Sequence, residues 1–176
     1  MSAPAARLPK TIEADPVADG LLELLADRAR PLWAGAAIGV ASLVAQDGVT
    51  TSLRSACRAG FVVRGLEAAE RRLAEEERGL KLAVGQEAGE GGVRISRLLV
   101  VTDDGAERFY RNVEGLLRRH SPRLYAVRLE IDEHAFGELL YGAGRVARLA
   151  LLVHKNSVAD FLLAVARQCR AEDGPD

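Results

Sequence analysis

Two hydrophobic periods alternate along the second half of the chain. Short apolar runs predict strands at residues 98–101, 124–131 and 146–153. Between and after them, apolar side chains recur at helical spacing over residues 106–120, 133–140 and 158–169. Strands that alternate with helices predict a layered α/β domain whose sheet is largely parallel or mixed.

The first half of the chain is patterned less clearly. Residues 1–15 are rich in Ala, Pro and charge, and we expect a flexible tail there. Residues 16–49 form an N-terminal extension of undefined role, which opens with a leucine-rich helix that ends near Pro31. Within it, the uncharged run Trp33–Val44 fits either a tightly packed helix or a pair of strands.

Two glycines mark the stretch after a helix predicted over residues 50–59. Gly60 is placed to cap that helix in the left-handed conformation, and Phe61–Val63 is a short apolar run. Gly65 then turns the chain into a helix expected from Leu66 to about Leu80. Free N–H groups at a helix start, with arginines nearby, can hold a phosphate. An ordinary helix–strand–helix connection with a basic rim explains the same residues.

Three polar segments complete the pattern. The acidic triplet Glu75–Glu77 is typical of a solvated helix face. Gly85 to Gly92 contains four glycines and predicts a loop. Residues 171–176 are expected to form an acidic, frayed tail.

Composition narrows the class of protein. Hydrophobic residues make up 48% and charged residues 28%, as in globular domains. The net charge of −1 argues against strong non-specific nucleic-acid binding but allows a local basic patch. Cys57 and Cys169 lie far apart, which predicts ordinary thiols in a reducing compartment and no metal site. The longest uncharged run is too short to cross a bilayer. We therefore expect a cytoplasmic protein without a cofactor or a membrane contact.

One pair of acidic residues is a candidate phospho-accepting or metal-binding site. Asp103 and Asp104 follow an apolar strand, where phospho-accepting or metal-binding carboxylates occur in open α/β sheets, and Lys155 beside His154 is a possible partner. Alternatively, the two acids cap the helix that begins at Ala106. Neither a nucleophile elbow nor a P-loop is present.

The order of motifs resembles a known family of RNA-binding domains. Arg58–Ala59–Gly60–Phe61–Val62–Val63–Arg64–Gly65 is similar to the Arg-Ala-Gly-Lys-x-x-x-Gly signature of the kink-turn-binding ribosomal-protein superfamily, the L-seven-Ae and L-thirty-e group. Its bacterial YlxQ-type members are the nearest. The other matching segments are Leu98–Val101 with Asp104, Ala135–Glu138, Gly142–Val146 and Leu149–Val165. The resemblance covers roughly residues 50–167.

The resemblance implies a three-layer α-β-α sandwich with a mixed sheet over residues 50–170, preceded by the helical extension. It also implies non-catalytic binding of structured RNA, with ribosomal RNA as the candidate, in connection with ribosomes or their assembly. Kink-turn binders place an Asn where this chain has Glu67, and their helix lysine is Arg71 here. The implied RNA-binding residues are Arg58, Arg64, Gly65, Leu66, Glu67, Ala68, Arg71, Gly142, Ala143, Gly144, Arg145 and Val146.

Two other functions remain open at this point. The chain could keep the fold without RNA and bind a protein partner, for example through residues 16–49. It could also be a small phosphotransfer or nucleotide enzyme that uses Asp103 or Asp104.

Overall fold

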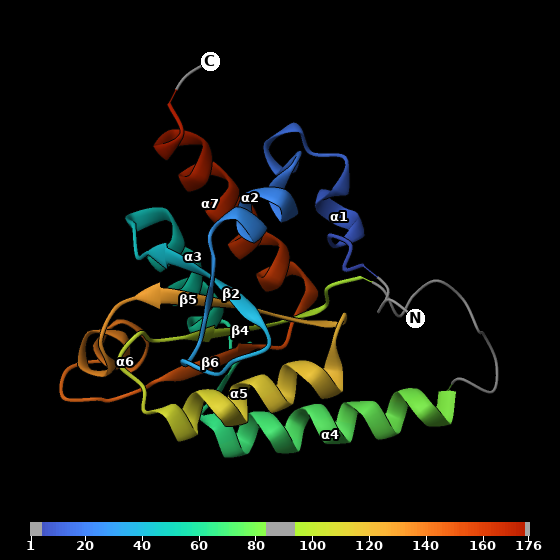
Figure 1. Ribbon diagram of the computed structural model, residues 1–176, viewed down its shortest axis with the longest axis vertical. Helices are drawn as coiled ribbons and strands as arrows, with labels where there is room; N and C mark the ends of the chain where they lie inside the picture. Colours follow the sequence, from blue (N-terminus) through green and yellow to red (C-terminus); the bar gives the residue numbers. More distant parts are fainter. Residues whose placement is uncertain (1–4, 84–93, 175–176) are drawn as a thin grey trace.

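A six-stranded mixed sheet lies between two layers of helices in the computed structural model, which describes residues 5–83 and 94–174 (Figure 1). This is the predicted three-layer α-β-α sandwich. The strands are β1 (Ala29–Pro31), β2 (Gly39–Val44), β3 (Val62–Arg64), β4 (Arg97–Val101), β5 (Leu124–Glu130) and β6 (Leu149–Leu152). Their order across the sheet is β1-β2-β5-β4-β6-β3.

The sheet combines a parallel centre with antiparallel edges. β5 is parallel to both β2 and β4. β6 runs antiparallel to β4 and pairs on its other side with β3, while β1 closes the opposite edge against β2. The fold therefore brings β3 and β6 together although they stand far apart in the sequence.

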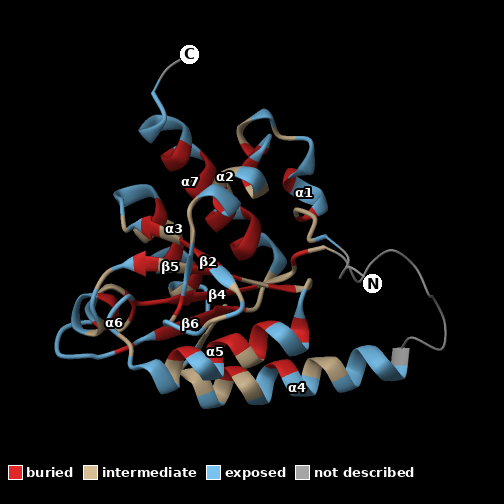
Figure 2. Ribbon diagram, in the orientation of Figure 1, coloured by how far each residue is buried: buried red, intermediate tan, exposed pale blue. Residues whose placement is uncertain are grey.

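Helices cover both faces of the sheet. The helices α4 (Leu66–Ala83) and α5 (Glu107–His120) lie together on one face. The other face carries α3 (Asp47–Arg58), α6 (Glu133–Tyr141) and α7 (Lys155–Glu172), with the short elements α1 (Lys10–Glu13), η1 (Pro16–Ala18) and α2 (Leu21–Asp27) packed beside α7. In both layers the buried residues face the sheet (Figure 2).

The uninterrupted apolar run of β4 follows from this burial on both faces. Leu98 and Val100 belong to the core beneath α3 and α7, whereas Leu99 and Val101 belong to the core beneath α4 and α5. All four side chains are fully buried. Because neighbouring residues of a strand point to opposite faces, a strand covered on both sides must be apolar at every position.

The N-terminal extension begins with helices, as expected, and then joins the sheet. η1 and α2 come first, and β1 and β2 follow, with Leu43 of β2 opposite Leu129 of β5. The run Trp33–Val44 thus supplies a strand, which also pairs with β1. One expectation is corrected here, because residues 1–15 are not entirely a tail: α1 buries Ile12 against α7.

Two further expectations are corrected, one about a charged side chain and one about the C-terminus. Glu76 is not a solvated residue, because Arg72, Arg97 and Arg123 all contact its carboxylate at 2.6–3.1 Å. The C-terminal tail begins later than expected, since α7 continues to Glu172. The expected loop from Gly85 to Gly92 lies outside the described residues. Among the described helices, none is long and apolar enough to cross a bilayer.

Candidate nucleic-acid interface

The turn at Gly60 forms as its sequence predicts. Gly60 has a φ of 79°, its N–H donates to the carbonyl of Cys57 at 3.1 Å, and the N–H of Phe61 donates to the carbonyl of Ala56 at 3.0 Å. This pair of hydrogen bonds is the Schellman motif at the end of a helix. The motif requires one residue in the left-handed conformation, which glycine adopts without strain. It sends the chain directly into β3 at the edge of the sheet.

Gly65 makes the second turn, with a φ of 85°. Its N–H donates to the carbonyl of Leu149 at 3.3 Å, and its own carbonyl accepts from Ala69 in the first turn of α4. The amides of Leu66, Glu67 and Ala68 form no hydrogen bond with a described residue. The start of α4 therefore presents the free N–H groups that an anion can accept from.

The loop over residues 142–146 is entirely exposed. Gly142 ends α6 with a φ of 99°, and Gly144 has a φ of 77°. The loop returns across α6 so closely that a side chain on Gly137 would collide with its backbone. A Cβ there would lie 2.6 Å from the Cα of Val146 and closer still to the carbonyl of Arg145. Gly137 thus fixes the path of this loop.

The turn at Gly65 and the loop over residues 142–146 lie side by side. Arg64 donates from Nη2 to the carbonyl of Val146 at 2.9 Å. The guanidinium of Arg64 also lies 4.5 Å from the ring centre of Tyr141. Together with the bond from Gly65 to Leu149, these contacts join the two segments into one surface, which we call the paired-loop surface: residues 64–68 and 142–146.

Two of the arginines near this surface are already engaged within the protein. Arg71 lies 3.6 Å from Glu67, whose side chain is 92% exposed, and Arg64 supports the loop as described. By contrast, Arg145 and Arg58 are exposed, and their side chains form no hydrogen bond or ion pair with a described residue. Arg145 is therefore the loop's available cation, while Arg58 has no described contact with either segment.

Tyr141 is a residue of this surface that the sequence reasoning missed. Its ring supports Arg64, and its hydroxyl is buried without a hydrogen bond to a described residue. Burial raises the pKa of Tyr141 to about 12; Cys57 adds to the rise and Arg64 opposes it. Its position directly before Gly142 was the available signal, because the last turn of a helix faces the loop that follows it.

The acids at the end of β4 do not form the site considered for them. Because β6 runs antiparallel to β4, Lys155 lies at the other end of the sheet from Asp103 and Asp104. The acids do not cap α5 either, since Ala106 occupies that position without a side-chain bond. Instead, Asp104 accepts from the amide of Glu133 at the start of α6, at 3.0 Å. Among residues 5–83 and 94–174, no cluster of His, Cys, Asp and Glu could hold a metal.

Comparisons with known proteins add little to this geometry. No protein-family model matches the sequence, and no curated protein is significantly similar to it. Among solved structures, a protein of unknown function from Bacillus halodurans is similar at 14% identity, with a TM-score of 0.46, over 69% of this chain and 99% of the other. Similarity at this level carries no argument about fold or function.

Proposed function

We propose that this protein binds structured RNA without catalysis, through the paired-loop surface. We also propose that it belongs to the kink-turn-binding ribosomal-protein superfamily, near its YlxQ-type members, and acts on ribosomal RNA or during ribosome assembly. One observation carries the proposal. The two segments that the resemblance assigns to RNA, far apart in sequence, are joined by the bond from Arg64 to Val146.

The chemistry of the surface suits a nucleic acid. The free amides at the start of α4 and the unpaired guanidinium of Arg145 are groups that bind phosphate. The loop also exposes the apolar side chain of Val146, which is 40% accessible, against which a base can pack. Sequence-specific RNA binding usually targets unpaired bases in loops and bulges, so a base displaced from its helix fits this loop.

Glu67 sets how this turn can contact RNA. A carboxylate only accepts hydrogen bonds, so Glu67 cannot donate to a base acceptor as the Asn of kink-turn binders does. In this protein Glu67 is paired with Arg71 at 3.6 Å. We therefore propose that the turn contributes backbone amides and charge, and that the loop over residues 142–146 contributes the base contact.

RNA titrations of the full chain test the proposal. A kink-turn RNA and a mixed ribosomal-RNA pool are titrated at two salt concentrations, with Arg145→Ala as the variant. We expect binding at low salt that weakens as salt rises. Arg145→Ala should reduce affinity and lower the slope of log K against log salt by about 0.7–0.9, because the variant neutralises one phosphate fewer.

Arg78→Ala is the matched control, since Arg78 is also exposed and its side chain is unpaired among the described residues, but it lies toward the far end of α4. It should leave both affinity and salt slope unchanged. If neither RNA binds at low salt, the proposed function is wrong. If the two variants weaken binding equally, RNA binds through general charge and not through the paired-loop surface.

A further inference from the structure

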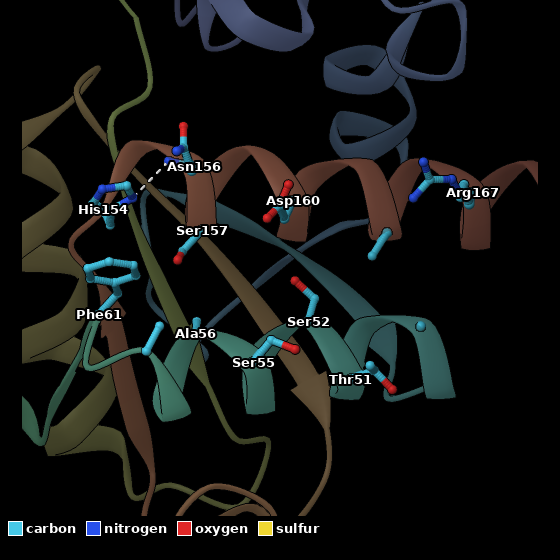
Figure 3. Close-up of a pocket in the computed structure, with 13 residues that line it drawn as sticks. Thr51, Ser52, Ser55, Ala56, Phe61, His154, Asn156, Ser157, Asp160 and Arg167 are labelled. Atoms are coloured by element: carbon cyan, nitrogen blue, oxygen red, sulfur yellow. Dashed lines mark hydrogen bonds between the residues drawn. The ribbon is translucent and has the colours of Figure 1, made fainter.

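A long groove runs between α3 and α7, on the sheet face opposite α4 (Figure 3). One cavity of about 430 Å³ opens near His154, and a second of about 300 Å³ continues toward Ala171. Gly48, Ala164 and Arg167 line both, so the two cavities form one channel along α7. From Ser157 to Ala171 the channel is roughly 21 Å long at 1.5 Å per residue.

The groove exists because small side chains line it, and two of them carry unused hydroxyls. Ser157 on α7 is only 9% exposed, yet its hydroxyl forms no hydrogen bond with a described residue. The hydroxyl of Ser52 on α3 is likewise buried without a partner among the described residues. Both side chains point into the space between the helices (Figure 3). The Ser52 hydroxyl is closed off by its surroundings, whereas the Ser157 hydroxyl is available to a hydrogen-bonding partner that enters the groove.

Two exposed charges on α7 also lack partners. The side chains of Asp160 and Arg167 form no ion pair or hydrogen bond with a described residue. They lie on either side of Ala164, four residues before it and three after it. Small residues, Ser157 and Ala171, stand seven positions away from Ala164 in each direction. Along the groove side of α7, small residues therefore alternate with one acidic and one basic residue, in the order small, acidic, small, basic, small.

The order of charges on α7 is complementary to the same order on a second, antiparallel copy of the helix. If two α7 helices lie antiparallel with Ala164 at the centre, each Asp160 faces the Arg167 of the other copy. At 1.5 Å per residue the charges lie about 6 and 4.5 Å from the centre, and this offset is well within the reach of an arginine side chain. Ser157 of one copy then faces Ala171 of the other, so small residues meet where the helices are closest.

We propose that the occupant of this groove is a second copy of the chain. The two copies form a two-fold dimer in which each α7 lies in the α3–α7 groove of its partner, with the axis near Ala164. A two-fold interface uses the same patch twice, which a self-complementary charge pattern satisfies. The four helices pack as an antiparallel bundle, and the hydroxyl of Ser157 finds an acceptor on the facing helix.

Charge reversal on α7 tests the dimer in the full chain. Sedimentation equilibrium of the wild-type protein over a concentration series should show a monomer–dimer equilibrium. Asp160→Arg places two arginines opposite each other at both ends of the interface, and Arg167→Asp does the same with two acids. Each variant should weaken dimerisation about 10- to 100-fold, because two exposed pairs change from attraction to repulsion.

Mixing the two variants is the decisive step. Asp160→Arg and Arg167→Asp restore both opposite-charge pairs only when they combine, so an equimolar mixture should form a heterodimer of near wild-type affinity. Glu75→Arg, a reversal at an exposed site on α4 that is unpaired among the described residues, is the control and should leave dimerisation unchanged. Circular dichroism of each variant confirms its folding.

Three results would overturn the proposal. If the wild-type protein stays monomeric throughout the concentration series, the groove does not bind a second copy of the chain. A dimer that both reversals leave intact forms through another surface. Variants that remain folded and monomeric, but do not recombine on mixing, show that Asp160 and Arg167 do not face each other.

Discussion

Replacing Gly137 by alanine tests how the loop over residues 142–146 is held. In an ordinary helix, Gly→Ala stabilises by about 1 kcal/mol. At Gly137 the new Cβ would lie 2.6 Å from the Cα of Val146 and 2.5 Å from the carbonyl carbon of Arg145. These are backbone atoms, which cannot rotate away as a side chain does. The loop must therefore shift as a unit.

The magnitude follows from the hydrogen bonds that this shift disturbs. Overpacking costs about 1–3 kcal/mol. The bonds from Ala147 to Glu133 at 3.0 Å and from Arg64 to Val146 at 2.9 Å are the ones at risk, at about 1 kcal/mol each. After subtraction of about 1 kcal/mol for helix propensity, Gly137→Ala should lower the free energy of unfolding by about 2–4 kcal/mol.

Urea denaturation followed by circular dichroism measures this effect, as a lower midpoint at an unchanged slope. Gly115→Ala is the matched control in the middle of α5, where the nearest atom to a Cβ is the flexible Nη2 of Arg119 at 3.9 Å. It should raise stability by up to about 1 kcal/mol. If Gly137→Ala stabilises the protein as much as Gly115→Ala does, the loop is not seated on α6 and the reasoning is wrong.

Two further predictions concern the carboxylates of Glu76, which is part-buried, and Glu114, which is buried. Glu76→Gln should cost about 2 kcal/mol in urea denaturation, because it leaves part-buried guanidiniums without their anion, whereas the exposed Glu75→Gln should change stability by less than about 0.5 kcal/mol. Burial would raise the pKa of Glu76, but hydrogen bonds from Arg97 and Arg123 outweigh it and lower that pKa. The stability that Glu76 supplies is therefore present above the ordinary carboxylate pKa of about 4.3 and lost as pH falls through the lowered value. As pH is lowered, the difference in unfolding free energy between the wild type and Glu76→Gln should become smaller. A difference that stays unchanged contradicts the assignment. Glu114→Ala removes the carboxylate that accepts a hydrogen bond from the Trp33 indole at 2.9 Å. The fluorescence emission of this sole tryptophan should therefore shift to the red. An unshifted spectrum would show that the contact is absent in solution.

Local patterns in the sequence determined the elements of the second half of this fold. The apolar run at residues 98–101 becomes the fully buried part of β4, and the helical period over residues 106–120 becomes α5. Turn chemistry was equally readable, since Gly60 and Gly65 both adopt positive φ. The helix and the turns depend on hydrogen bonds within a few residues of the chain, and the continuous apolar run marks a buried strand by its composition, so the sequence predicts these features directly.

Only the tertiary structure decided which elements are neighbours. The order of the sheet depends on pairings between distant strands, and no local pattern indicated that β2 lies beside β5. The same holds for the partners of charged groups: Arg97 and Arg123 beside Glu76, and the amide that Asp104 accepts from, come from other elements.

The candidate site combines both kinds of information. The sequence supplied the two glycine-bearing segments and, by resemblance, the expectation that they act together. It did not show Tyr141 beneath Arg64 or the close approach of the loop to Gly137. The contact between Tyr141 and Arg64 requires β3 and β6 to be adjacent, and that adjacency is set by long-range pairing in the sheet.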